Sequence, residues 1–116
     1  MSIYRYDDYK KFVKDWAQSR GRGEYLRMAA YMGVNKTMLS QVFGGFKHLN
    51  LELASELGDY MCLEELEQEY LFALVDYARA GGDELRAKLR RRLQRLRRAS
   101  AGEIQIDNYV DTCSAV

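Results

Sequence analysis

The chain has 116 residues, of which 47% are hydrophobic, 12% aromatic and 30% charged, and it contains no proline. This length fits one domain, and there is no apolar run of about 18 residues and no signal-like start, which argues against a membrane span and a signal peptide. The two cysteines, Cys62 and Cys113, form no motif. We therefore expect a reduced, cytoplasmic protein.

The net charge of +1 conceals a segregation of charge along the chain. Residues 1–47 carry nine basic and four acidic side chains, whereas residues 48–82 carry one basic and eight acidic. Residues 83–98 carry eight basic and two acidic, and the tail from residue 99 carries three acids. A basic block is the electrostatic footprint of a nucleic-acid-binding surface, although sorting of charges onto solvated faces also explains it.

The first predicted helix spans about residues 4–19, and Gly21 and Gly23 end it. Its apolar stripe has the i, i+3, i+4, i+7 spacing of a buried helix face and consists of Tyr9, Phe12, Val13 and Trp16. A row of aromatic residues could also stack on single-stranded bases. The helical spacing favours a role in the core instead.

Two short helices follow, at residues 24–32 and 36–43, and they are joined by a tight turn at Gly33. Glycine suits such a turn because it tolerates positive φ, and Ala29, four residues earlier, is small enough for two helices to cross closely. Asn35 is the expected N-cap of the second helix, and Gly44 with Gly45 the expected end.

Three further helices are predicted. The first begins after Asn50, the second spans about residues 65–80, and the third spans residues 83–98 after a break at Gly81 and Gly82. We divide the chain into residues 1–80 as the main domain, 83–98 as a basic, leucine-striped helix for packing or dimerisation, and 99–116 as a linker or the start of a truncated second domain. The predicted fold class is all-α.

These helices resemble the helix-turn-helix domains of the Cro and phage-repressor class. The resemblance is carried by Gly33-Val34, by Leu39-Ser40-Gln41-Val42 and by Leu49-Asn50. It implies a five-helix bundle of the Cro/repressor type with an appended basic amphipathic helix.

More narrowly, residues 4–112 are similar to the N-terminal part of a family of predicted bacterial transcriptional regulators that carry a larger C-terminal domain of unknown role. The stripe Tyr9, Phe12, Trp16, the segments 39–47 and 67–72 and the leucine-arginine helix carry this similarity. It implies that the chain stops near the start of the second domain, as a truncated form or a short natural relative, and that an effector would bind that missing domain.

The chain departs from the family pattern at the end of the fourth helix. Cys62 stands where a C-cap glycine is usual, Glu64 where a Ser or Thr N-cap is usual, and Gly58 where alanine is usual. We expect a weaker turn there, and we expect Cys62 to be a small buried side chain.

The helix at residues 36–43 is the expected recognition helix, with Leu39 and Val42 facing the core. Its exposed residues offer hydrogen bonds and a methyl group to base edges, and the expected base contacts are Lys36, Thr37, Ser40 and Gln41. The expected phosphate contacts are Arg27, Asn35, Lys47 and His48, with the lysines of the first helix as further candidates. For His48 and for any single lysine, plain solvent exposure is the simpler explanation.

The helix at residues 83–98 has leucines at 85, 89, 93 and 96, but it is short for a coiled coil, and its arginines would repel in a parallel dimer. We expect it to pack on the acidic middle of its own chain or of a dimer partner. Direct phosphate binding by Arg90, Arg91, Arg92 and Arg95 is the alternative.

The chain offers nothing from which to assemble an active site, because it has one histidine, no metal-ligand spacing and no phosphate loop after a strand. We expect neither an enzyme nor a cofactor or metal. The expected function is sequence-specific binding of double-stranded DNA by a homodimer in transcription regulation. The alternative is a helical protein-interaction or oligomerisation module that keeps the fold without binding DNA.

Overall fold

The computed structural model describes residues 2–102, and every regular element within that range is helical, which confirms the all-α class. The elements are the 3₁₀ helix η1 (Ile3–Arg5) and the α-helices α1 (Tyr9–Arg20), α2 (Glu24–Met32), α3 (Lys36–Phe43), α4 (Leu51–Tyr60), α5 (Glu65–Arg79) and α6 (Asp83–Ser100). None of these helices is both long and apolar enough to cross a bilayer. Cys113 and residues 103–116 of the predicted linker lie outside the described residues.

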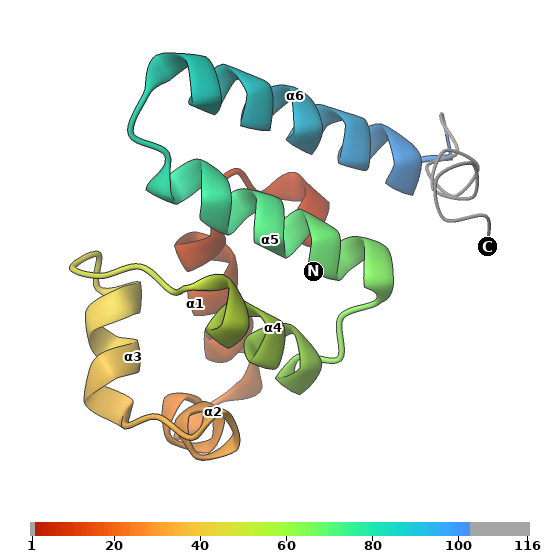
Figure 1. Cartoon of the computed structure of the whole chain (residues 1–116). Helices are drawn as coiled ribbons and strands as arrows, with labels where there is room; N and C mark the ends of the chain where they lie inside the picture. The colour runs from red at the N-terminus through yellow and green to blue at the C-terminus, as the bar shows by residue number, and fades with distance from the viewer. Residues whose placement is uncertain (1, 103–116) are drawn as a thin grey trace.

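Helix α5 lies in the middle of the molecule (Figure 1). It contacts α6 on one side and η1, α1 and α4 on the other, while α2 and α3 lie at the end of the molecule remote from α6. One continuous core joins these helices, and its fully buried side chains include Tyr9, Met28, Leu39, Leu57, Tyr70 and Leu74. The core therefore fixes α3 through α1 and α2.

Helix α1 begins at Tyr9, five residues later than predicted. Asp8 caps it by accepting the Lys10 N–H at 2.9 Å, and the tyrosines before it belong to η1 and to extended backbone. Tyr9, Phe12 and Val13 are buried as predicted. Trp16 is only half-buried, because it lies at the edge of the core against Tyr60, with ring centroids 5.9 Å apart.

Helix α4 ends in a left-handed turn formed by a cysteine. Cys62 has φ +59°, and the N–H of Leu63 donates to the Gly58 carbonyl at 3.0 Å. This hydrogen-bond pattern is that of a helix end at which the left-handed residue is usually glycine. Cys62 is exposed, so the expectation that it is buried was wrong: the residue past the helix end faces solvent.

Cys62→Gly should stabilise the protein. An L-residue in the left-handed region costs about 1–2 kcal/mol, and glycine avoids that cost while losing part of the gain to its greater freedom in the unfolded chain. We expect the free energy of unfolding, measured by urea denaturation, to rise by about 0.5–1 kcal/mol. The matched change is Gly33→Ala, at a similar turn with φ +72°, which should lower it. A loss of stability in Cys62→Gly would contradict this account of the turn.

Helix α6 packs on α5 and η1 of its own chain, two residues longer than predicted at its C-terminal end. Leu89, Leu93 and Leu96 are buried, whereas Leu85 is 50% exposed. A dimer formed by the leucine face of α6 would need Leu89, Leu93 and Leu96, and these three side chains are already covered. Any dimer of this chain therefore has to use a different surface.

Candidate nucleic-acid interface

The turn between α2 and α3 sets the direction of α3. Gly33 adopts φ +72° and ψ +27°, and the N–H of Val34 donates to the Ala29 carbonyl at 3.1 Å. Asn35 Oδ1 accepts the Met38 N–H at 2.7 Å, so Asn35 caps α3 as predicted. The capping bond uses the side-chain oxygen and leaves the amide NH₂ as the donor that could reach a phosphate.

Helix α3 has one buried and one exposed face. Leu39, Val42 and Phe43 are buried, and the Phe43 ring stacks on Tyr25 with centroids 5.7 Å apart and an interplanar angle of 8°. On the other face, Lys36, Thr37 and Ser40 are exposed and Gln41 is half-buried. The four predicted base-contacting residues thus share one side of the helix.

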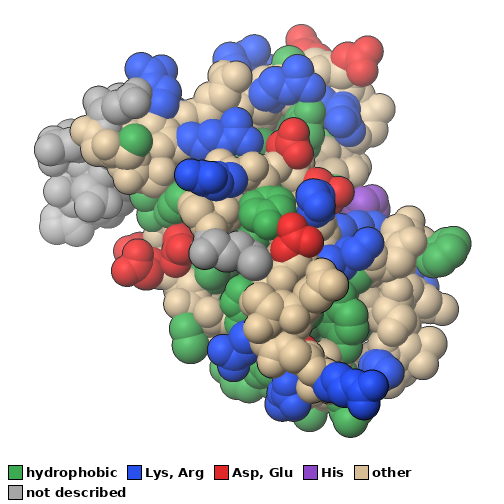
Figure 2. All heavy atoms as spheres, turned by 180° about the vertical axis from the view of Figure 1, so that it is seen from behind, with side chains coloured by type: hydrophobic (Ala, Val, Ile, Leu, Met, Phe, Trp, Pro, Cys, Tyr) green, Lys and Arg blue, Asp and Glu red, His purple; other side chains and the backbone are tan. Residues whose placement is uncertain are grey.

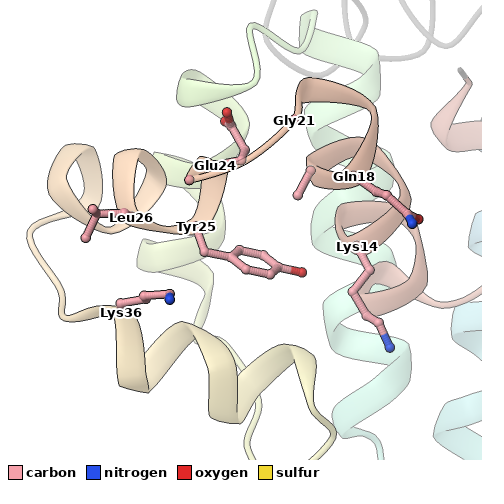
Figure 3. A pocket seen from close by; sticks show the side chains of 9 residues that line it. Lys14, Gln18, Gly21, Glu24, Tyr25, Leu26 and Lys36 are labelled. Atoms are coloured by element: carbon pink, nitrogen blue, oxygen red, sulfur yellow. The ribbon is translucent and has the colours of Figure 1, made fainter.

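An open groove of about 530 Å³ lies at the start of α3, where it meets α1 and α2 (Figure 3). Lys14 and Gln18 of α1, Tyr25 of α2 and Lys36 of α3 line it. Burial raises the pKa of Tyr25, so its phenol stays protonated and remains a hydrogen-bond donor at neutral pH. The groove therefore offers ammonium and hydroxyl donors next to the exposed face of α3.

Glu24 also lines this groove, but its carboxylate is occupied elsewhere. Only 3% of Glu24 is exposed; its Oε2 accepts the Tyr60 hydroxyl at 2.6 Å, and its Oε1 lies 2.8 Å from Arg27 Nη2. Arg27 Nη2 also donates to the Arg22 carbonyl at 3.1 Å. The guanidinium of Arg27 is thus held by Glu24, and its role as a phosphate contact stays a prediction.

Lys14 and Lys36 of the groove form one basic group, and a second group of basic side chains surrounds the loop after α3. Lys10 of α1 donates to the Lys47 carbonyl at 2.5 Å, and Arg79 of α5 donates to the Leu49 carbonyl at 3.2 Å. The Leu49 N–H donates to the Tyr9 hydroxyl at 3.1 Å, so the loop is tied to α1 and α5. The side chains of Lys47 and His48, in this anchored loop, are exposed to solvent.

The surroundings of His48 favour its neutral form. Burial lowers its pKa, and the positive charges of Lys10 and Arg79 lower it further. The neutral ring lies 3.2 Å, through Nδ1, from the hydroxyl of Tyr9, which can donate to it. At neutral pH His48 would therefore meet a phosphate as a hydrogen-bond donor through its other ring nitrogen.

Phe46 is the most exposed large apolar residue of the described chain, at 84%. It follows the Gly44–Gly45 end of α3, and its N–H donates to the Gln41 carbonyl at 2.9 Å. Of the two phenylalanines near this turn, Phe43 is the one that packs inside. The ring of Phe46 lies next to Gly44, just past the C-terminal end of α3.

Sequence reasoning did not single out Tyr25, Gln18 or Arg79. Nothing in the local pattern marks them, because the tertiary structure brings them to the site: Gln18 and Tyr25 line the groove, and Arg79 donates to the loop after α3. Among residues 2–102, no group of three or more His, Cys, Asp and Glu side chains is placed to hold a metal ion.

Comparisons with protein families, with curated proteins and with solved structures find no match to this chain.

Proposed function

We propose that this chain binds double-stranded DNA sequence-specifically in bacterial transcription regulation, with α3 in the major groove. The observation that carries the proposal is the arrangement around α3: an exposed polar face lies between two basic groups, one at each end of the helix. Eight residues of helix span about 12 Å, short enough to lie within the major groove. With α3 in the groove, the basic groups at its two ends would contact the flanking phosphates.

In this proposal the chain has a Cro/repressor-type helix-turn-helix, and each residue set has a separate task. Lys36, Thr37, Ser40 and Gln41 read base edges, while Lys14 and Lys47 hold the phosphate backbone. One such module buries a small interface, so specific binding would use a homodimer on half-sites about 34 Å apart.

The first test is fluorescence anisotropy of a labelled mixed-sequence duplex titrated with the full chain from about 50 to 200 mM salt. We expect affinity to fall steeply with salt. Lys14→Gln with Lys47→Gln should weaken binding to all duplex sequences alike and lower the slope of log K against log salt by about two. Arg5→Gln removes one positive charge from an exposed residue of η1, away from α3, and should change the slope little.

The exposure of Phe46 favours one rival function, docking of a protein partner beside α3. If the folded chain binds no duplex even at the lowest salt, with circular dichroism showing its helices intact, the DNA proposal fails. The chain would then be a protein-interaction module, and Phe46→Ala would be the variant to examine for loss of a partner.

A further inference from the structure

Helix α6 carries seven arginines and one lysine, and the structure divides them between two faces. Arg97 faces inward: its Nε donates to the Tyr70 hydroxyl at 2.8 Å and to the Tyr4 carbonyl at 3.0 Å. Arg90 donates to the Tyr77 hydroxyl at 2.6 Å, and the Arg86 guanidinium lies 4.6 Å from the centre of the same ring. These three arginines help to attach α6 to the rest of the chain.

The outward face has a different character. Lys88, Arg91, Arg92 and Arg95 are all exposed and follow the i, i+3, i+4, i+7 spacing of a single helix stripe about 10 Å long. Within residues 2–102, no hydrogen bond or ion pair joins the side chain of Lys88, Arg91 or Arg92 to another residue. Figure 2 shows basic side chains over α6 at one end of the molecule and further basic side chains across the middle and at the other end of this face.

The row of cations on the outward face of α6 does not stabilise the helix. Like charges at i+3 and i+4 destabilise a helix by about 0.2–0.5 kcal/mol for each pair. The helix dipole favours cations only in the last turn, and Lys88, Arg91 and Arg92 lie before it. The repulsion among Lys88, Arg91 and Arg92 therefore costs stability, and no ion pair of these three side chains within residues 2–102 offsets it.

The burial of the leucine face of α6 excludes two kinds of partner for this helix, a second coiled-coil helix and a lipid bilayer. A coiled-coil partner or insertion into a bilayer would need exposed leucines, but Leu89, Leu93 and Leu96 are buried on α5. What α6 presents to solvent is a row of cations that is mostly arginine. Arginine is the side chain best suited to phosphate, because its planar fork can donate two parallel hydrogen bonds.

We propose that the outer face of α6, centred on Lys88, Arg91 and Arg92, is a second surface that binds the phosphate backbone of duplex nucleic acid without reading its sequence. It lies at the opposite end of the molecule from α3. Helix α3 packs on α1 and α2, whereas α6 packs on α5 and η1. The two surfaces therefore engage different stretches of duplex, and their contributions to binding are independent.

The test separates this surface from the one at α3. In a full-length chain whose α3 side carries Lys14→Gln, Lys36→Gln and Lys47→Gln, we expect residual, salt-dependent binding to a mixed-sequence duplex. Adding Arg91→Gln and Arg92→Gln should abolish most of it. In the otherwise unchanged chain, the same two α6 substitutions should weaken binding to a mixed-sequence duplex while leaving the affinity for a preferred sequence, which α3 binds, nearly as it was.

The control is Arg5→Gln, which removes one positive charge from an exposed residue of η1, and its effect is compared with that of Arg91→Gln alone. Equal losses in the control and the α6 variant would show a general charge effect and overturn the proposal. Unchanged duplex binding in Arg91→Gln with Arg92→Gln would also overturn it. So would a result in which these substitutions weaken binding of the chain to phosphatidylserine vesicles but not to duplex DNA. Because the substitutions remove repulsion on an exposed face, thermal unfolding should show an intact fold. If α3 variants have no effect but α6 variants do, the function proposed above fails and this surface remains.

Discussion

Replacing Lys36 and Gln41 together with alanine should lower the affinity for a preferred duplex sequence by roughly 100-fold or more. A well-formed bidentate contact to a base is worth about 1–3 kcal/mol of discrimination, and two such contacts would be removed at once. Both residues lie on the side of α3 away from Leu39 and Val42, so the core should not change. The loss should appear in the specific complex and far less in binding to unrelated sequences.

A duplex selected from a random library by the unaltered chain provides the substrate, and anisotropy against a scrambled duplex provides the ratio of affinities. Gln94→Ala is the control, since it removes an exposed glutamine from α6 at the other end of the molecule. If the double variant retained its preference for the selected duplex, α3 would not be the reading helix.

The local part of this structure was predictable from the sequence. The boundaries of α2 and α3, the positive φ of Gly33 and the cap at Asn35 follow from rules that involve residues a few positions apart. The faces of α3 follow from its periodicity alone. The start of α1 was missed because the tyrosines before it look like one more turn of an amphipathic helix.

Those tyrosines are needed in another conformation. The extended backbone around Tyr6 leaves its carbonyl free to accept the Tyr70 hydroxyl at 2.7 Å and Arg97 Nη2 at 3.2 Å. Arg97 also packs its guanidinium against the Tyr70 ring, 5.8 Å from its centre. Contacts between residues more than 60 positions apart outweigh the local pattern here, and no local rule anticipates them.

The packing of α6 was predicted from charge, and the structure gives a different reason for it. We expected arginines to meet the acidic side chains of α4 and α5. The arginines that face inward instead meet tyrosine hydroxyls and rings, at Tyr70 and Tyr77, beside the buried leucines. Charge totals for a segment identify the sign of a surface, but they do not show which side chains the folded chain brings together.

The candidate site was predictable to a similar extent. The exposed residues of α3 could be named from the sequence because they are close together in the chain. The basic groups at its two ends come from α1 and α5 as well, so Tyr25, Gln18 and Arg79 enter only through the tertiary structure.

Glu24→Ala should lower the free energy of unfolding by about 2 kcal/mol, the loss expected when a buried charged acceptor with good donors is removed. The Tyr60 hydroxyl accounts for most of this estimate, since Arg27 is half-exposed and solvent screens its ion pair. Glu24 joins the start of α2 to the end of α4, with Arg20 of α1 3.9 Å away. Glu56→Ala, on the exposed side of α4, is the control and should change stability little.

Glu24→Ala should also make the free energy of unfolding less dependent on pH in the acid range. Burial alone would raise the pKa of Glu24, but the hydrogen bonds from Tyr60 and Arg27 and the charges of Arg27 and Arg20 outweigh it and hold the pKa below its ordinary value of 4.5. The unfolded chain therefore takes up this proton at a higher pH than the folded chain, so the contribution of Glu24 is complete above the ordinary pKa and is lost as the pH falls through the lower pKa of the folded state. Urea denaturation at a series of pH values should show the native chain and Glu24→Ala differing most near neutrality and converging in acid. A difference that stayed constant down to pH values well below the ordinary pKa would mean that the charge of Glu24 does not contribute to stability and that only the packing of its side chain does.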